Sequence, residues 1–571
     1  MKRFLVLLGV VLISSSLPLI PSSAEAIDPD APFFLPDDGR AGLMGAFFND
    51  QATGEKTSHL IDSIKWQNNQ IDPTCTSIQD PSCTSNTLEF RSIIPFCQSD
   101  SDINCVEEVG AIKEDGTKVA AKFKQYFPLK AQNEFSGDAS YQLPSGKAGS
   151  LVSMPGISHK GGEEFLVTVQ LNGSVDKVNR KTRVDGFLAR IVPVQLVDIK
   201  TWSPSSCPPE VCDVGWVYHD PLKRWAEVGS GGPTCEATSA RTAQCAEKRA
   251  FPPNLRFYLK TRLNVSPSGW LHGRFAEPEV SIEAKEGITR IAVEALPVRV
   301  PILFKSYLWA EAPEAIKAGY NPSTGFFKLG NHHGSYRIAD SDKETDPTKR
   351  NFISTPLPSG KTGIEELKLW LPILEDKATA MASIWSIRTL RQEETEGANP
   401  CFDSKTELTG LVTTNATQYS AGPPAFDKAE GTLTYQVGAP HFTPTGEVFK
   451  GRYNLSMRSE VARCVYQFSK APIRAELSVV SADGSPQVAT TVVSEKNGWV
   501  YLSAANFEFS TPVIKAKLTQ EVVVEPTLTP TAAATAKPAQ KKITITCVKG
   551  KSTKKVTTIK PKCPSGFKKK G

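Results

Sequence analysis

The largest group of side chains that could act together is a set of eleven lysines in the last segment, 541–571. This segment has no acidic residue, and Cys547 and Cys563 bracket what reads as a hairpin. Ammonium groups concentrated on a small closed hairpin favour contacts with phosphates or carboxylates, and salt weakens such contacts. We therefore predict that these lysines bind an anionic cell-envelope polymer; a solvated tail that binds nothing is the alternative. They are Lys541, Lys542, Lys549, Lys551, Lys554, Lys555, Lys560, Lys562, Lys568, Lys569 and Lys570.

A second candidate is the tetrapeptide Ser359–Thr362, which is similar to the end of a phosphate-binding loop. The complete motif needs a glycine five residues before Gly360, where this chain has Thr355. Prolines just upstream also lack the amide N–H groups that would cradle a phosphate. We interpret the stretch as a turn at the start of a helix and expect no nucleotide or other cofactor.

Histidines next to a run of alternating acids are the best metal-ligand candidates, because oxygen-rich flexible loops suit Ca²⁺. The glycine that an EF-hand loop needs at its sixth position is absent, since Thr345 stands there, and no HExxH motif occurs. We predict a solvated loop and no metal site. The candidate residues are His332, His333, Asp340, Asp342, Glu344 and Asp346.

The twelve cysteines fall into near neighbours along the chain. An even number in an exported chain indicates disulfides, and the absence of CxxC pairs excludes zinc ribbons and thioredoxin-like redox sites. Nearest-neighbour pairing is the simplest hypothesis, although the sequence alone does not fix connectivity. The pairs would be Cys75 with Cys83, Cys97 with Cys105, Cys207 with Cys212, Cys235 with Cys245, Cys401 with Cys464, and Cys547 with Cys563.

Enzyme motifs are lacking in the large middle part of the chain, where no GxSxG occurs. Paired carboxylates of a glycosidase meet only in the fold and cannot be recognised from sequence. An irregular stretch at 306–400 is where we would place an enzyme site, because functional residues concentrate on loops carried by a scaffold. Four rings at 202–225 could stack on a sugar or peptide, but we favour the interpretation that they cover a neighbouring sheet: Trp202, Trp216, Tyr218 and Trp225.

The start of the chain predicts export. Met1–Ala26 has a positive beginning, an apolar core at Phe4–Ile13 and the small-x-small pattern of a cleaved signal peptide, so we expect maturation at Ile27. No later stretch reaches the ~18–20 apolar residues of a membrane helix. The net charge is +6, and because the tail alone contributes +11, residues 27–540 are mildly acidic. We therefore expect no nucleic-acid partner.

Forty-two prolines and 40 glycines, with several runs of alternating apolar residues, predict a mainly β protein. We expect antiparallel β-sandwich-like domains with disulfide-stapled loops and a few short helices, at about 312–318 and 363–371. In 401–520 we predict about seven strands, one of them at 463–469. The predicted organisation is a signal peptide at 1–26, a β-rich region with Cys-stapled loops at 27–200, a Cys/Trp-rich insert at 201–250, a β-rich region with short helices at 251–400, a sandwich at 401–520, a Thr/Pro/Ala linker at 521–540 and the basic hairpin at 541–571.

Two stretches, 457–510 (with RCVYQFSKAP) and 546–570 (TCVKGK…KPKCPSGFKKK), resemble segments of uncharacterised secreted proteins of actinobacteria. Residues 96–112 and 269–275 add to the resemblance. It implies a bacterial, extracytoplasmic setting and carries over no activity and no catalytic residue.

From these features we predict a secreted, envelope-associated binding or structural protein of unknown ligand, tethered by its basic tail. The alternative is an extracytoplasmic hydrolase that acts on a wall or environmental polymer. The sequence leaves enzyme activity uncertain, with binding favoured, and it does not give the oligomeric state.

Overall fold

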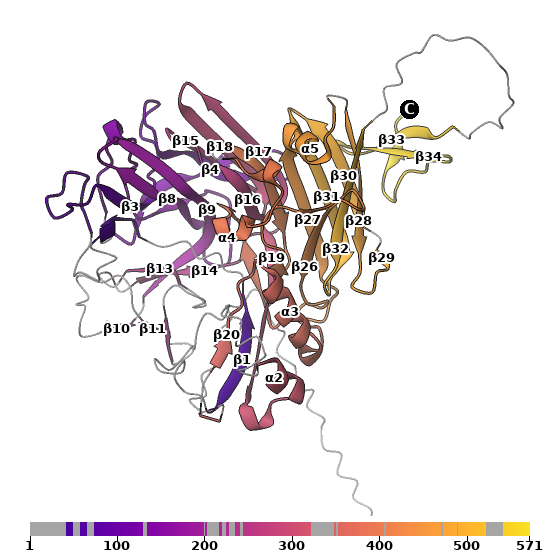
Figure 1. The fold of residues 1–571 in the computed structure, drawn as a ribbon, viewed down its shortest axis with the longest axis horizontal. Helices are drawn as coiled ribbons and strands as arrows, with labels where there is room; N and C mark the ends of the chain where they lie inside the picture. The colour runs from indigo at the N-terminus through magenta and orange to yellow at the C-terminus, as the bar shows by residue number, and fades with distance from the viewer. Residues whose placement is uncertain are drawn as a thin grey trace, which may run out of the picture. The chain divides into compact units, whose positions relative to one another are not determined.

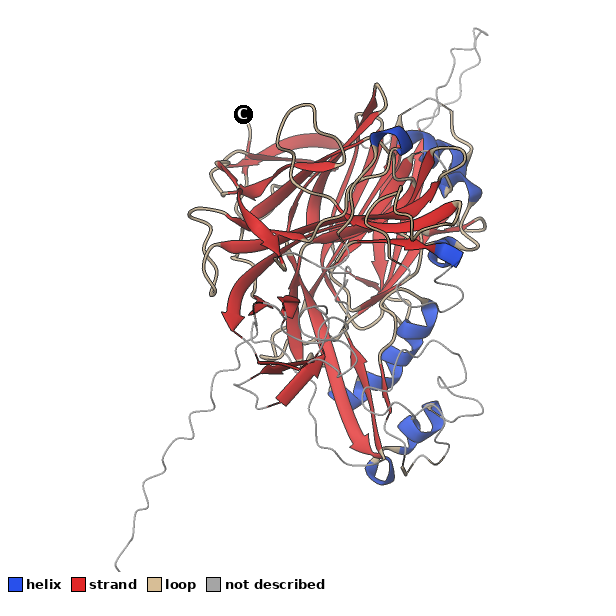
Figure 2. Ribbon diagram, turned by 90° about the vertical axis from the view of Figure 1, so that its left-hand side faces the viewer, coloured by secondary structure: helices blue, strands red, loops and turns tan. Residues whose placement is uncertain are grey.

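The computed structural model describes residues 42–49, 57–64, 74–129, 134–198, 200–202, 216–219, 224–227, 235–239, 242, 244–320, 346, 348–349, 352–404, 407–469, 472–487, 489–520 and 541–571. The chain divides into two compact units, Met1–Glu521 and Val522–Gly571. We call the first unit the body and the described part of the second, 541–571, the tail. The predicted class is confirmed, because the structure is mainly β with several antiparallel sheets and short helices (Figures 1 and 2).

The body is organised around a 14-stranded sheet. Its main path joins strands from both ends of the body, and it is antiparallel except where β16 and β23 pair in parallel. In order, the path is β2 (His59–Asp62), β3 (Thr87–Ile93), β8 (Glu164–Asp176), β9 (Lys181–Asp198), β22 (Ser386–Thr389), β16 (Gly269–Arg274), β23 (Leu408–Thr414), β27 (Lys450–Arg458), β31 (Trp499–Glu508) and β30 (Thr490–Lys496). The branches are β7 (Gly149–Ser153) with β6 (Lys122–Phe127), and β14 (Gln244–Lys248) with β13 (Cys235–Ser239).

Two smaller sheets pack against this long sheet and enclose two hydrophobic cores. A five-stranded sheet covers the first core, which contains Val169, Phe257 and Val293. A six-stranded sheet covers the second core, which contains Tyr435, Leu455 and Leu502. The five strands are β17 (Ala276–Lys285), β18 (Ile288–Leu296), β15 (Arg256–Leu263), β4 (Cys105–Ile112) and β5 (Lys118–Ala120). The six are β24 (Gln418–Tyr419), β25 (Ala425–Asp427), β26 (Thr432–Gly438), β32 (Val513–Gln520), β28 (Ile473–Val480) and β29 (Pro486–Gln487).

The local sequence explains these strands. In β18 every second side chain, from Thr289 onward, is buried, as period-two alternation requires of a strand with one face on a core. The long sheet also joins strands from regions that we expected to be separated by boundaries near residues 200, 250 and 400. The pairing of β14 with β9 spans the first boundary, that of β22 with β9 spans the first two, and that of β23 with β16 spans the third. Such pairing between distant segments leaves no mark in a local pattern.

A four-stranded sheet lies at another part of the body, with the helices at 314–319 and 361–370 beside it (Figure 1). The helices expected near 312–318 and 363–371 are present, and apolar residues of both pack into one core with Ile316, Leu367 and Trp370. The strands are β20 (Phe352–Ser354), β1 (Leu43–Phe48), β19 (Val298–Leu308) and β21 (Ala380–Ile384). Among the described residues of the body, the helices are α2 (Glu314–Gly319), α3 (Lys361–Trp370), α4 (Gln392–Thr395) and α5 (Ser459–Tyr466). Single 3-10 turns are η1 (Ala139–Tyr141), η3 (Trp309–Glu311), η5 (Pro372–Leu374) and η6 (Pro400–Phe402).

One predicted strand is wrong. Residues 463–469 were expected to form a strand, but Ser459–Tyr466 form α5, whose buried side chains include Val461, Ala462 and Val465. These positions form one helical face, and a short apolar run does not distinguish a helix from a strand by itself. The disulfide between Cys401 and Cys464 therefore joins η6 to this helix rather than to a strand.

Five of the predicted disulfides are confirmed within the described residues: Cys75–Cys83, Cys97–Cys105, Cys235–Cys245, Cys401–Cys464 and Cys547–Cys563. Cys207 and Cys212 lie outside the described residues. The insert at 201–250 contributes β13 and β14, and a separate three-stranded sheet of β10 (Lys200–Trp202), β11 (Trp216–His219) and β12 (Arg224–Glu227) includes part of it. Among the described helices, none is long and apolar enough to cross a membrane.

The tail forms its own three-stranded sheet. The predicted hairpin is present, with β33 (Ile543–Lys549) antiparallel to β34 (Ser552–Thr558), and the short β35 (Lys568–Lys569) pairs with the other edge of β33. The disulfide between Cys547 and Cys563 closes the loop that contains β34. So small a sheet has little apolar core, which makes the covalent link an important part of its stability.

Candidate functional site

All eleven lysines of the tail have exposed side chains. The tail has no acidic side chain that could neutralise them. The pairing register distributes the lysines over both faces of the sheet. Lys554 and Lys569 lie opposite Cys547 and share its face, whereas Lys555 lies opposite Thr546 and Lys568 opposite Val548 on the other face. The tail can therefore contact a polyanion from more than one side.

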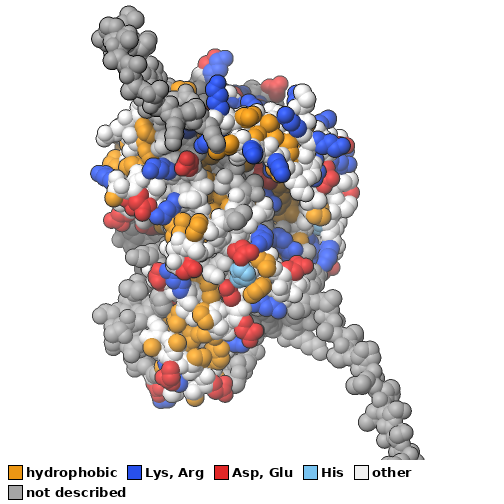
Figure 3. Space-filling view, turned by 90° about the vertical axis from the view of Figure 1, so that its right-hand side faces the viewer, with side chains coloured by type: hydrophobic (Ala, Val, Ile, Leu, Met, Phe, Trp, Pro, Cys, Tyr) orange, Lys and Arg blue, Asp and Glu red, His pale blue; other side chains and the backbone are white. Residues whose placement is uncertain are grey.

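A small apolar centre holds this charged sheet together. Ile545 and Cys547 are its buried residues, and the ammonium group of Lys554 lies 5.2 Å from the centre of the Phe567 ring. A cation over an aromatic face is attracted by the ring and still contacts water. On the face of the molecule in Figure 3, basic and acidic side chains are intermingled. The sequence of the tail, by contrast, supplies basic side chains only.

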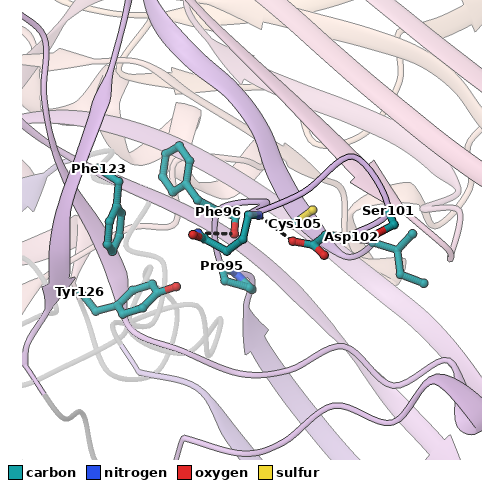
Figure 4. Close-up of a pocket in the computed structure, with 9 residues that line it drawn as sticks. Pro95, Phe96, Ser101, Asp102, Cys105, Phe123 and Tyr126 are labelled. Carbon is teal, nitrogen blue, oxygen red and sulfur yellow. Dashed lines mark hydrogen bonds between the residues drawn. The ribbon is translucent and has the colours of Figure 1, made fainter.

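The body has a cleft of about 560 Å³, which opens beside the disulfide between Cys97 and Cys105 (Figure 4). In that view the rings of Phe123 and Tyr126 stand on one side, Ser101 and Asp102 lie on the other, and Phe96 lies between them. We call this the aromatic cleft. Its lining residues are Pro95, Phe96, Gln98, Ser101, Asp102, Ile103, Cys105, Phe123 and Tyr126.

The aromatic side of the cleft comes from two segments. Phe123 and Tyr126 belong to β6, a strand at the edge of its sheet, and their ring centres are 5.0 Å apart in an edge-to-face arrangement. Phe96 precedes the disulfide loop, and its ring centre is 5.8 Å from that of Phe123. Partial burial raises the pKa of Tyr126, against a smaller opposing effect of the Lys147 charge and with a small contribution from Glu134, so its hydroxyl stays protonated at neutral pH.

The polar side of the cleft is the loop between Cys97 and Cys105, which we call the 97–105 loop. The Asp102 carboxylate accepts hydrogen bonds from the backbone N–H groups of Gln98 at 2.6 Å and Ser99 at 3.0 Å, and from the Ser99 hydroxyl at 2.7 Å. The Ser99 hydroxyl, followed by these backbone groups, lowers the pKa of Asp102, so the carboxylate is ionised at neutral pH. The loop thus presents a fixed acceptor.

A buried arginine supports the same loop from β15. The Arg262 guanidinium donates to the main-chain carbonyls of Asp100 and Asp102, and it also pairs with Glu107. Nearby, the side-chain carbonyl of Asn104 accepts from the backbone N–H of Asn264 at 3.0 Å. The disulfide, the Asp102 hydrogen bonds and these links fix the shape of the loop.

The turn at Ser359–Thr362 has a structural role, as the sequence predicts. Gly360 precedes α3, and its N–H donates to the carbonyl of Tyr419 at 2.8 Å. The Ser359 hydroxyl donates to the Glu394 carboxylate at 2.6 Å, and Arg388 donates twice to the same carboxylate at 2.7 Å. These contacts join the start of the helix to α4.

The metal candidates His332, His333, Asp340, Asp342 and Glu344 lie outside the described residues. Asp346 is described, and its carboxylate accepts from the hydroxyl of Thr348 at 2.6 Å. Within the described part of the chain, no three His, Cys, Asp or Glu side chains are grouped so that they could hold a metal ion. The rings of the 202–225 stretch likewise have no described side chains.

Among the described residues of the 306–400 region, Glu366 has a buried carboxyl group. Burial raises its pKa to about 7, and it is 1% exposed. The Tyr320 hydroxyl donates to it, and the Trp370 ring N–H donates to Tyr320 at 2.6 Å. This network lies in the core beside α3, where a polymer substrate does not reach.

Sequence reasoning missed the aromatic cleft. Its rings come from two segments about 30 residues apart, and only the fold brings them together. A usable signal was present in Lys122–Phe127, where aromatic and lysine residues share an edge strand close to a cysteine pair.

No protein family, no curated protein and no solved structure matches this chain. A functional assignment therefore depends on the tail and the aromatic cleft themselves.

Proposed function

We propose that this is an exported binding protein that residues 541–571 hold on an anionic polymer of a bacterial envelope. The observation that carries the proposal is the set of eleven exposed lysines in a tail without an acidic residue. Each exposed ion pair contributes little by itself, typically ~0–1 kcal/mol, but many contacts along a polyanion add up and are weakened by salt. A small sheet closed by a disulfide keeps the charges close together.

Two further features support export. The first 26 residues have the pattern of a cleaved signal peptide, and disulfides form and persist in oxidising compartments outside the cytosol. The resemblance to secreted actinobacterial proteins is in line with such a setting. The stretch 521–540, rich in Thr, Pro and Ala, would separate the tail from the body.

The body fits binding better than catalysis. The residues that line the aromatic cleft include one carboxylate, that of Asp102, which is already engaged by three donors. Most glycosidases need a second acid across the scissile bond. An extracytoplasmic hydrolase remains the alternative, and steady release of soluble fragments from envelope by the purified protein would favour it.

Co-sedimentation with isolated bacterial envelope tests the tether. Purified 27–571 should pellet with the envelope and be released as the salt concentration rises, whereas 27–525 should stay in the supernatant. Replacing Lys554, Lys555, Lys568 and Lys569 by glutamine should reduce pelleting, and the matched replacement by arginine should preserve it. Equal pelleting of 27–571 and 27–525 would overturn the proposal.

A further inference from the structure

The aromatic cleft exposes more ring surface than core packing explains. Phe123, on the edge strand β6, is 42% exposed. Tyr126 and Phe96 are half-buried beside it. Leaving apolar surface in water costs about 25 cal/mol for each Å², so a group of bare rings in a concave site points to a ligand.

The opposite side of the cleft is polar and already ordered. Asp102 offers a carboxylate held by the Gln98 and Ser99 backbone, and Gln98 and Ser101 are exposed beside it. Arg262, a buried residue that is 5% exposed, fixes the loop through the carbonyls of Asp100 and Asp102. A loop that is ordered before binding loses little conformational entropy when a ligand arrives.

We infer that the aromatic cleft binds a neutral sugar ring of a glycan, which stacks on Phe123, contacts the neighbouring Tyr126 ring and donates its hydroxyls to the 97–105 loop. A pyranose ring has an apolar C–H face and a hydroxyl-rich edge, which match the aromatic side and the polar side of the cleft. The volume of about 560 Å³ lies in the range of small-ligand sites, which is about 300–1,000 Å³. This inference deepens the proposed function and rests on it for the expectation that the protein meets glycans outside the cell.

Two other ligand classes fit less well. An anion would meet the ionised Asp102 across the cleft. An organic ammonium ion would be attracted by the rings, as in aromatic cages. However, the charge of Asp102 already interacts with three hydrogen-bond donors and with the Arg262 guanidinium.

Titration calorimetry of 27–571 with chitohexaose and with cellohexaose tests the inference. We expect at least one of these neutral probes to bind with a Kd below about 1 mM. Phe123→Ala and Tyr126→Ala should each weaken binding roughly fivefold to tenfold, and Phe123→Trp, which keeps a stacking surface, should retain it. Leu129→Ala is the matched control, because Leu129 is 41% exposed just after β6 but does not line the cleft, and its affinity should be unchanged.

Failure to bind either sugar at 10 mM would overturn the inference, as would full affinity in a folded Phe123→Ala variant. Binding of choline chloride without binding of either sugar would also overturn it and assign the site to an ammonium ligand. Because both probes are neutral and soluble, they do not report on the lysine tail. Sugar binding with no salt-sensitive pelleting would contradict the tether alone, and the reverse result would contradict the glycan site alone.

Discussion

The guanidinium of Arg262 donates a hydrogen bond to the main-chain carbonyl of Asp102 at 3.1 Å, across 160 residues of sequence. This contact fastens the 97–105 loop to the sheet behind it, because the same guanidinium also binds Asp100 and Glu107. The geometry of the polar side of the aromatic cleft therefore depends on Arg262, a buried residue that does not line the cleft.

Arg262→Met should destabilise the body by about 3 kcal/mol, because it removes the buried partner of two loop carbonyls and one of the three cations that pair with Glu107. Urea unfolding of the full chain measures this loss. Arg183→Met is the control, since Arg183 pairs with Asp185 at an exposed site, and its effect should stay within about 0.5 kcal/mol. Equal effects of the two replacements would contradict the role assigned to Arg262.

The disulfides should differ in their contribution to stability according to the loops they close. Cys401 and Cys464 are 63 residues apart, whereas Cys75 and Cys83 are 8 apart. On the chain-entropy account, replacing both members of the first pair by alanine should cost about 4 kcal/mol, and the second pair about 2.5 kcal/mol. Denaturation of the two double variants measures the order, and the reverse order would contradict the entropic explanation.

Glu394 should make the body sensitive to acid. Burial would raise its pKa, but the hydrogen bonds and charge of Arg388 outweigh burial and lower the pKa to about 2. A carboxyl with a lowered folded-state pKa contributes stability above its unfolded value, near 4.5, and loses that contribution as the pH falls toward 2. Glu394→Gln should cost roughly 3 kcal/mol at pH 7, and the difference from the parent should shrink between pH 4.5 and 2. A constant difference over this range would be inconsistent with the ion pair.

Glu366 should have the opposite pH dependence. Burial is the main cause that raises its pKa to about 7, so the folded state holds a proton that the unfolded state has lost. The contribution of protonated Glu366 to the stability of the folded state is fully present below pH 4.5 and is lost as the pH rises through 7. Glu366→Gln removes this loss, so its melting temperature relative to the parent should increase from pH 4.5 to pH 8. Parallel melting curves for parent and variant across this range would refute the assignment.

Local patterns in the sequence predicted the class of fold well. The hairpin of the tail and the short helix expected near 363–371 are set by neighbouring residues, and both are present. The few apolar residues of 463–469 fit either period, and packing of Val461 and Val465 against the second core selects the helix.

Long-range pairing could not be predicted in the same way. The parallel contact of β16 with β23 joins segments about 140 residues apart, and no local feature of Gly269–Arg274 indicates its partner. The same distinction applies to the two candidate sites, the tail and the aromatic cleft. The lysines of the tail are adjacent in sequence and were recognised, whereas Phe96, Phe123 and Asp102 form a cleft only after β4, β6 and the loop have packed.

Transfer of the tail to an inert soluble protein tests the central claim most directly. Residues 521–571 would be fused to a carrier that does not bind bacterial envelope, and the fusion would be mixed with isolated envelope over a salt series. We predict that the fusion pellets at low salt, is released as salt screens the lysines, and stays in the supernatant when the lysines of 541–571 are replaced by glutamine. A fusion that remains soluble under conditions where 27–571 pellets would contradict the claim and assign envelope recognition to the body.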